Sequence, residues 1–174
     1  LQLCDTFDLP ILSLMDCPGI MPGPEYEQTA LLRHIGRLLV TGANLTTPLF
    51  GVVVRKAYGM GVRAMCGGSS LEPFFTVAWP TGEFADVTIE GHVQLKYGDE
   101  LSAIEDPAER NAVRESLVGS HIDLATAVNS AGTNYGIDDV IDPADTRAWI
   151  AQGLRSVPPV LPREDKKRPN VDTW

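Results

Sequence analysis

The sequence predicts an α/β fold in which a parallel sheet is covered by helices. Short apolar runs rich in β-branched residues alternate with segments of helical periodicity, and glycines and prolines mark the turns between them. A chain of 174 residues with 44% hydrophobic residues can bury one core of good size. We therefore expect one globular unit, with a ligand crevice beyond the carboxyl ends of its strands.

The first half of the chain is expected to alternate strands and helices. Strands and helices follow one another at residues 10–16, 24–42, 49–54, 62–66 and 74–79. Pro24 suits the first turn of its helix, and apolar residues recur at helical spacing from there to Gly42. This order places three residues on the carboxyl edge of the sheet: Asp16, Tyr58 and Pro80.

The second half is expected to be mainly helical. Asp106 and Asp142 each precede a proline and then an acid, a strong signal for the start of a helix. The first of these helices is expected to run to about Asn129 and the last to end at Gly153. Between them we expect a loop at 132–136 and a short strand or extended link at 137–141.

The end of the chain differs in composition from the rest. Beyond Ser156 it contains four prolines and seven charged residues, with too little apolar content to form a core of its own. We expect this tail to lie along a neighbour or to be disordered.

Charge and cysteine content argue against several classes of protein. The net charge of −9 opposes a nucleic-acid partner, because phosphate binding needs dense Lys and Arg. The apolar runs are far shorter than the roughly 20 residues that cross a bilayer, and no signal-peptide pattern is visible, so no membrane role is expected. Cys4, Cys17 and Cys66 are odd in number and lack metal-ligand spacing, which favours buried thiols in a reducing cytoplasm and no metal site.

Side chains alone do not form a familiar catalytic constellation. The three histidines lie in helical segments, and the G-x-S-x-G pattern of a nucleophile elbow is absent. Residues 59–64 match the G-x-G-x-x-A dinucleotide fingerprint after a strand. The acid expected at the end of the next strand is missing, since the chain reads Trp79-Pro80-Thr81-Gly82 there. The dinucleotide interpretation is therefore weak.

The turn Gly59-Met60-Gly61 is the most informative segment. Free N–H groups at a helix start attract negative charge, because they lack partners and lie at the positive end of the helix dipole. The turn therefore predicts a site for an anion or oxyanion. Arg55 and Lys56 at the strand end could fix that anion or could be solvated charges, and the glycines could equally serve close packing of helix on sheet.

Several short motifs follow one another along nearly the whole chain. They include Leu14-Met15-Asp16-Cys17-Pro18-Gly19, Arg55-Lys56-Ala57-Tyr58-Gly59, Ala78-Trp79-Pro80-Thr81-Gly82-Glu83 and Ile137-Asp138-Asp139-Val140-Ile141-Asp142-Pro143. Together they resemble the C-terminal half of the carboxyltransferase (β) subunit of biotin-dependent acyl-CoA carboxylases, of the acetyl-/propionyl-CoA carboxylase type. The resemblance implies a crotonase-like (ClpP/crotonase) spiral fold, with residues 1–156 as a partial C-terminal carboxyltransferase domain and residues 157–174 as an extended tail.

The same resemblance implies a reaction. Carboxybiotin releases CO2, the cofactor takes the α-proton of an acyl-CoA, and the resulting thioester enolate attacks CO2. The cofactor itself is then the base, which explains why few side-chain acids, bases or nucleophiles are found. Biotin would arrive on a separate carrier, and an acyl-CoA would be the substrate.

The family pattern Y-G-G-A aligns with Tyr58-Gly59-Met60-Gly61 and implies roles for single residues. The backbone amides of Met60 and Gly61 would hold the biotin oxyanion, and methionine is acceptable there if its φ is negative. Further residues implied to contact the cofactor are Tyr58, Gly59, Pro18 and Gly19. Arg63 would look toward the acyl pocket and influence substrate choice, and the other expected substrate-binding residues are Arg55 and Lys56.

In this family the active site lies between the N-terminal half of one subunit and the C-terminal half of another. The implied partners are an N-terminal carboxyltransferase half, in the same or a separate chain, a biotin carboxylase and biotin carboxyl carrier subunit, and further copies arranged as a dimer of trimers. Two alternatives remain: the carboxyltransferase subunit of a biotin-dependent decarboxylase, and a degenerate non-catalytic scaffold. Met60, Arg63 and the bulky segment 85–92, expected to perturb a helix start, motivate the scaffold.

Overall fold

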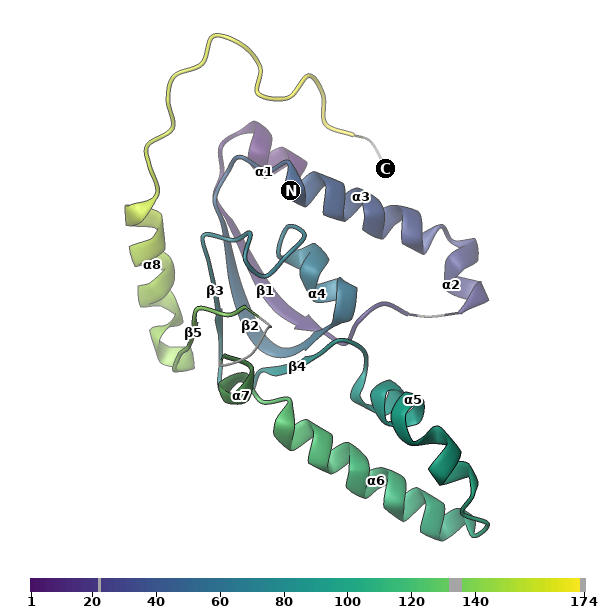
Figure 1. The fold of residues 1–174 in the computed structure, drawn as a ribbon. Coiled ribbons are helices and arrows are strands. Elements are labelled where there is room, and N and C mark those ends of the chain that lie inside the picture. Colours follow the sequence, from purple (N-terminus) through teal and green to yellow (C-terminus); the bar gives the residue numbers. More distant parts are fainter. Residues whose placement is uncertain (22, 132–135, 173–174) are drawn as a thin grey trace.

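The computed structural model describes residues 1–21, 23–131 and 136–172, and its centre is a parallel sheet (Figure 1). The described strands are β1 (Ile11–Cys17), β2 (Leu49–Tyr58), β3 (Phe75–Ala78), β4 (Glu83–Ala85) and β5 (Asp139–Val140). They lie in the order β1-β2-β3-β5, and β4 pairs with the far end of β2. Every pair is parallel, which confirms the predicted α/β fold.

Helices cover both faces of the sheet (Figure 1). Helix α4 (Gly59–Met65) packs through Val62 and Met65 on a core that contains Met15, Val53 and Ala57. Helix α3 (Leu31–Ala43) packs on the outside of α4, preceded by the short α2 (Pro24–Gln28). Helix α8 (Thr146–Ser156) covers the opposite face. Trp149 and Ile150 of α8 pack there on the second core, made of the residues Phe50, Val52, Phe75, Val77 and Ile141.

Strand β2 is longer than the sequence suggests. Its first five residues are buried, as expected of a central parallel strand, and it then continues through Arg55 and Lys56 to Tyr58. The last three residues of β2 pair with β4, a strand of three residues that the sequence analysis does not predict. Arg55 and Lys56 therefore lie inside the strand and not beyond its end.

Two helix starts in the second half of the chain follow their sequence signals, whereas the ends of the two helices that follow them do not. The carboxylate of Asp106 accepts a hydrogen bond from the Ala108 amide (3.0 Å) at the start of α6 (Pro107–Leu124). Asp142 does the same at the 3-10 turn η1 (Pro143–Asp145) that leads into α8. The prediction that α6 runs to Asn129 is wrong, because the chain breaks after Leu124 and re-forms a short α7 (Ala127–Ala131).

Gly153 is not the end of the last helix. It lies inside α8, which continues to Ser156, and a Cβ at this position would come within 2.8 Å of the rings of Phe50 and Phe75. The glycine therefore allows α8 to approach the sheet closely.

Helices α5 (Ile89–Ser102) and α6 form a hairpin that extends away from the sheet (Figure 1). The hydroxyl of Thr88 caps α5 by accepting a hydrogen bond from the Gly91 amide (3.1 Å), and Ile89 and Val93 are buried. The expected perturbation of this helix start by segment 85–92 is therefore wrong. Most of the predicted loop at 132–136 lies outside the described residues, and β5 occupies the predicted link at 137–141.

The tail lies along α1 and α3, which is one of the two outcomes expected from the sequence. Residues 157–172 form no helix or strand and run back over α1 (Gln2–Thr6) toward α3 (Figure 1). Asp172 is 3.0 Å from the Arg37 guanidinium, and its amide donates to Gln2 (2.8 Å). The division into a domain of residues 1–156 and a tail stays a prediction. In the described part of the chain, no helix has the length and hydropathy to cross a bilayer.

Candidate active site at the carboxyl edge of the sheet

The turns that follow β1 and β2 lie against each other. A Cβ on Gly61 would be 2.5 Å from the Cys17 sulfur and 3.5 Å from the Gly19 Cα, so the two turns leave no room for a side chain at position 61. Gly19 itself has a φ of +103°, a conformation that favours glycine. The structure therefore brings together the predicted Pro18-Gly19 turn and the predicted Tyr58–Gly61 segment, which are about 40 residues apart in the sequence.

The first turn of α4 presents backbone donors at this edge. The helix begins at Gly59, earlier than the expected residue 62, and Gly59 has a φ of +60°. Met60 does not have a positive φ, so it meets the condition for replacing glycine. Amides of a first turn have no acceptor within their own helix. Among the described residues, no loop carbonyl or side chain accepts a hydrogen bond from Met60 or Gly61.

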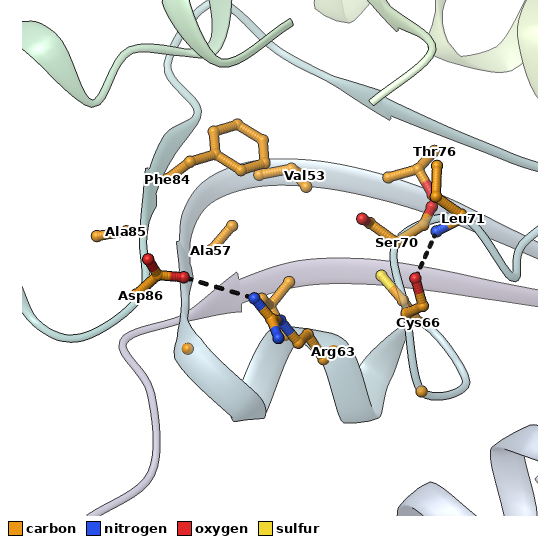
Figure 2. Close-up of a pocket in the computed structure, with 14 residues that line it drawn as sticks. Val53, Ala57, Arg63, Cys66, Ser70, Leu71, Thr76, Phe84, Ala85 and Asp86 are labelled. Atoms are coloured by element: carbon orange, nitrogen blue, oxygen red, sulfur yellow. Dashed lines mark hydrogen bonds and ion pairs between the residues drawn. The ribbon is translucent and has the colours of Figure 1, made fainter. Parts of the chain in front are cut away.

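A cavity of about 270 Å³ lies beside this turn, between α4, β2 and β4 (Figure 2). Apolar walls come from residues of the sheet and of α4: Val53, Ala57, Val62 and Phe84. Three residues with hydroxyl groups also line it: Ser69, Ser70 and Thr76. Of the predicted site residues, Gly59 and Arg63 line the cavity, while Met60 and Gly61 do not. The cavity thus adjoins the helix start without lying directly on the two predicted donors.

Arg63 extends from α4 toward Asp86, the residue that follows β4 (Figure 2). The closest nitrogen and oxygen are 3.4 Å apart, and both side chains are exposed. This long cationic side chain is accommodated beside an apolar wall because its charged end turns toward the carboxylate at the cavity mouth.

Arg55 is engaged with a carboxylate. Its guanidinium donates to both oxygens of Asp16, the shortest contact being 2.7 Å, and the backbone N–H of Lys56 also donates to Asp16 (3.2 Å). These hydrogen bonds lower the pKa of Asp16 below its ordinary value. The ammonium of Lys56 lies 5.9 Å from the centre of the Tyr58 ring. A role of Arg55 or Lys56 in holding an anion stays a prediction.

The structure also shows a pair that the sequence analysis does not identify. The hydroxyl of Tyr58 donates a hydrogen bond to the carboxylate of Glu83. Tyr58 is 3% exposed, and its burial and this hydrogen bond raise the pKa of the phenol above its ordinary value. Both residues belong to the quoted motifs, but 25 positions separate them, and no local pattern indicates that they meet.

Other reactive groups near the site have structural surroundings. Cys66 is buried with its sulfur 3.2 Å from that of Met15, and burial raises the pKa of the thiol to about 12. A thiol in this state is a poor nucleophile. Within the described ranges, no three His, Cys, Asp or Glu side chains are placed to hold a metal ion.

Comparisons with known proteins identify the family of this chain. The family model of the carboxyl transferase domain matches residues 1–158. The propionyl-CoA carboxylase carboxyltransferase subunit of Haloferax mediterranei is 36% identical over 98% of this chain and 33% of its own length. The methylmalonyl-CoA carboxyltransferase 12S subunit of Propionibacterium freudenreichii subsp. shermanii is 35% identical over 88% of this chain and 28% of its own length.

Solved structures give the same result. A single-chain, multi-domain long-chain acyl-CoA carboxylase matches 86% of this chain and 14% of its own, with 46% identity and a TM-score of 0.76. The transcarboxylase 12S hexamer, with methylmalonyl-CoA bound, matches 96% of this chain and 32% of its own, with 34% identity and a TM-score of 0.73. The chain thus spans about a third of the curated relatives' length. It has the crotonase-like fold and belongs to the carboxyl transferase domain family.

Proposed function

We propose that this chain is the C-terminal half of the carboxyltransferase component of a biotin-dependent acyl-CoA carboxylase. It would take part in transfer of a carboxyl group from carboxybiotin to the α-carbon of an acyl-CoA. The observation that carries the proposal is the first turn of α4, where the amides of Met60 and Gly61 have no side-chain or loop acceptor among the described residues. Two such donors fit a group that gains negative charge on oxygen.

Carboxybiotin on a separate carrier would supply the carboxyl group and, after its departure, the base for the α-proton. The chain's own contribution is to stabilise the negative charge that develops on an oxygen atom. The amides of Met60 and Gly61 donate to the oxygen on which charge develops, and they need no rearrangement because the packing of Gly61 on Cys17 and Gly19 fixes the turn. Backbone donors of this kind are worth about 10²- to 10³-fold in turnover each.

The cavity beside α4 supports a place for reactants next to these donors. Val53, Ala57 and Phe84 give it an apolar wall. Arg63 lines it with its charge paired to Asp86, so we assign Arg63 to contact with the acyl group and to substrate choice. Gly19 lies against Gly61 and against the carbonyl of Tyr58. These contacts support the proposed place of Tyr58, Gly59, Pro18 and Gly19 around the cofactor.

We propose that the chain works with an N-terminal carboxyltransferase half, a biotin carboxylase and biotin carboxyl carrier subunit, and further copies of itself. The transcarboxylase 12S relative forms a hexamer, which supports a dimer of trimers here. The three cysteines are free, which is compatible with the reducing environment of the cytoplasm. We place the assembly there.

A reconstituted transfer assay tests the proposal. The chain is combined with the N-terminal half and with a carrier that bears radiolabelled carboxybiotin, and label in acyl-CoA is measured for propionyl-CoA and for longer acyl-CoAs. We expect transfer only when both halves are present. Normal assembly without transfer to any acyl-CoA would favour the scaffold alternative. If the natural partner of the chain is a decarboxylase, and label moves from a carboxylated acyl-CoA to biotin, the decarboxylase alternative would be favoured.

A further inference from the structure

Tyr58 marks the point where β2 ends and α4 begins. It is the last residue of β2, and the helix starts at the next residue. Its aromatic side chain is buried, and its hydroxyl donates a hydrogen bond to the carboxylate of Glu83 on β4. The position of this ring therefore depends on β4 as well as on its own strand.

Strand β4 lies directly against the first turn of α4. Gly59 is in the left-handed conformation, and a Cβ there would be 2.8 Å from the carbonyl oxygen of Asp86, the residue after β4. A displacement of β4 would therefore be transmitted to Gly59 and to the amides of Met60 and Gly61 that follow it.

Strand β4 is short and is held from two sides. Its three residues pair with Lys56, Ala57 and Tyr58, while the Phe84 amide donates to the carbonyl of Ala125 (2.8 Å) at the end of α6. The backbone of Glu83 pairs with Lys56, and its side chain reaches Tyr58, two residues further along β2. Residues i and i+2 share a face of a strand, so this side-chain bond adds to the backbone ladder.

We propose that Glu83 and Tyr58 are positioning residues. Their hydrogen bond fixes β4 against the first turn of α4 and so holds the amides of Met60 and Gly61 in the direction of the developing oxyanion. This inference rests on the proposed function and deepens it. Neither side chain lines the cavity. The positioning role therefore acts through the backbone that the two side chains hold, and it is separate from the proposed place of Tyr58 beside the cofactor.

Four variants of the complete carboxyltransferase assembly test the inference: Tyr58→Phe, Glu83→Ala, Glu83→Gln and the double variant Tyr58→Phe with Glu83→Ala. Tyr58→Phe keeps the buried ring and removes only the hydroxyl. We expect Tyr58→Phe and Glu83→Ala each to lower kcat by on the order of tenfold, since misplacement of about 1 Å can cost about 10²-fold. The KM for acyl-CoA should not change. Glu83→Gln should retain most of kcat, because its amide oxygen can accept the Tyr58 hydroxyl.

The double variant shows whether Tyr58 and Glu83 lower kcat through their shared hydrogen bond or through two independent effects. A shared contact predicts that its kcat falls no further than that of either single variant. Tyr26→Phe on α2 and Glu105→Ala before α6 are matched controls and should keep wild-type kcat, because both residues are exposed and remote from β4. Wild-type kcat in Tyr58→Phe and Glu83→Ala, or multiplication of their losses in the double variant, would overturn the inference.

Hydrogen exchange distinguishes this inference from the function on which it rests. Faster exchange of the α4 amides in Glu83→Ala, but not in Glu83→Gln, would show that the contact holds the helix start even if the wild-type assembly transferred no carboxyl group. The reverse result, an active wild type with unchanged exchange and kcat in Glu83→Ala, would leave the proposed function intact and exclude positioning by Glu83.

Discussion

Polar groups at the two ends of the sheet differ in whether they have hydrogen-bond partners. Before β1 and β2 begin, the carboxylate of Asp5 is 2% exposed and accepts hydrogen bonds from the amides of Thr46 (2.9 Å) and Thr47 (3.1 Å). Lys167 (2.9 Å) and Arg168 (2.6 Å) of the tail complete its surroundings. At the carboxyl end, in the described part of the chain, the amides of Met60 and Gly61 have neither a side chain nor a loop carbonyl as acceptor.

This difference separates a structural end of the molecule from a functional one. At the amino end, a buried charge is fully surrounded by partners, which joins α1, the loop before β2 and the tail into one unit. At the carboxyl end, the chain also packs closely around Gly61, but the amide donors of the turn are left for a ligand. Rigid surroundings and unused donors together are what electrostatic stabilisation of a transition state requires.

Removal of the Asp5 charge should have the largest effect on stability. Asp5→Asn keeps an acceptor for the Thr46 amide but removes the buried counter-charge of Arg168 and one of the two carboxylates that Lys167 contacts. We expect a loss of about 3 kcal/mol in the free energy of unfolding, measured by chemical denaturation. Asp165→Asn, on an exposed residue of the same tail, is the control and should change little. Equal stability of Asp5→Asn and wild type would show that the tail is not fastened through Asp5.

The pH dependence of stability sharpens this point. Burial by itself would raise the pKa of Asp5, but hydrogen bonds from Lys167, Thr46 and Arg168 outweigh it and hold the pKa well below its ordinary value. The unfolded chain then binds a proton at higher pH than the folded one, so the contribution of Asp5 is full above about pH 5 and declines as pH falls below about 4. The stability difference between wild type and Asp5→Asn should shrink on acidification. A difference that is constant from pH 7 to pH 3 would contradict this assignment.

A smaller loss is expected from overpacking at the carboxyl end. Gly61→Ala places a methyl group against the Cys17 sulfur and should cost about 1 kcal/mol or more. Cys17→Ala removes that sulfur, so the double variant should lose less than the sum of the two single variants. Gly119→Ala on α6, where no atom lies within 4 Å of the added methyl, is the control and should not destabilise. Strict additivity would indicate that the two turns are not packed as described.

Local signals in the sequence predicted much of the fold. Asp106 and Asp142 cap their helices because the cap, the proline and the first turn are neighbours in sequence. Contacts between distant residues decided the features that were missed. Gly153 has the sequence signature of a helix end but serves close contact with Phe50 and Phe75, and β4 exists because its three residues pair with the end of β2.

The candidate site shows the same division. The glycine turn at residues 59–61 and its position at the carboxyl edge follow from the local pattern of strand, glycines and helix. The partners of its charged residues do not follow from a local pattern. Arg55 pairs with Asp16, which is 39 positions away, and Arg63 lies near Asp86 only because of the placement of β4. Composition and periodicity carry no information about such pairs.

The most direct test of the central claim is the turnover of Met60→Pro compared with Met60→Ala in the assembled enzyme. Met60 is 52% exposed, and proline is tolerated in a first helical turn, so Met60→Pro removes the N–H without disturbing a buried residue. A proline at Gly61 would instead collide with Cys17. We predict that Met60→Pro lowers kcat by about 10²-fold at nearly unchanged KM for acyl-CoA, while Met60→Ala stays close to wild type. A folded and assembled Met60→Pro enzyme with wild-type kcat would contradict the claim that this amide stabilises the oxyanion.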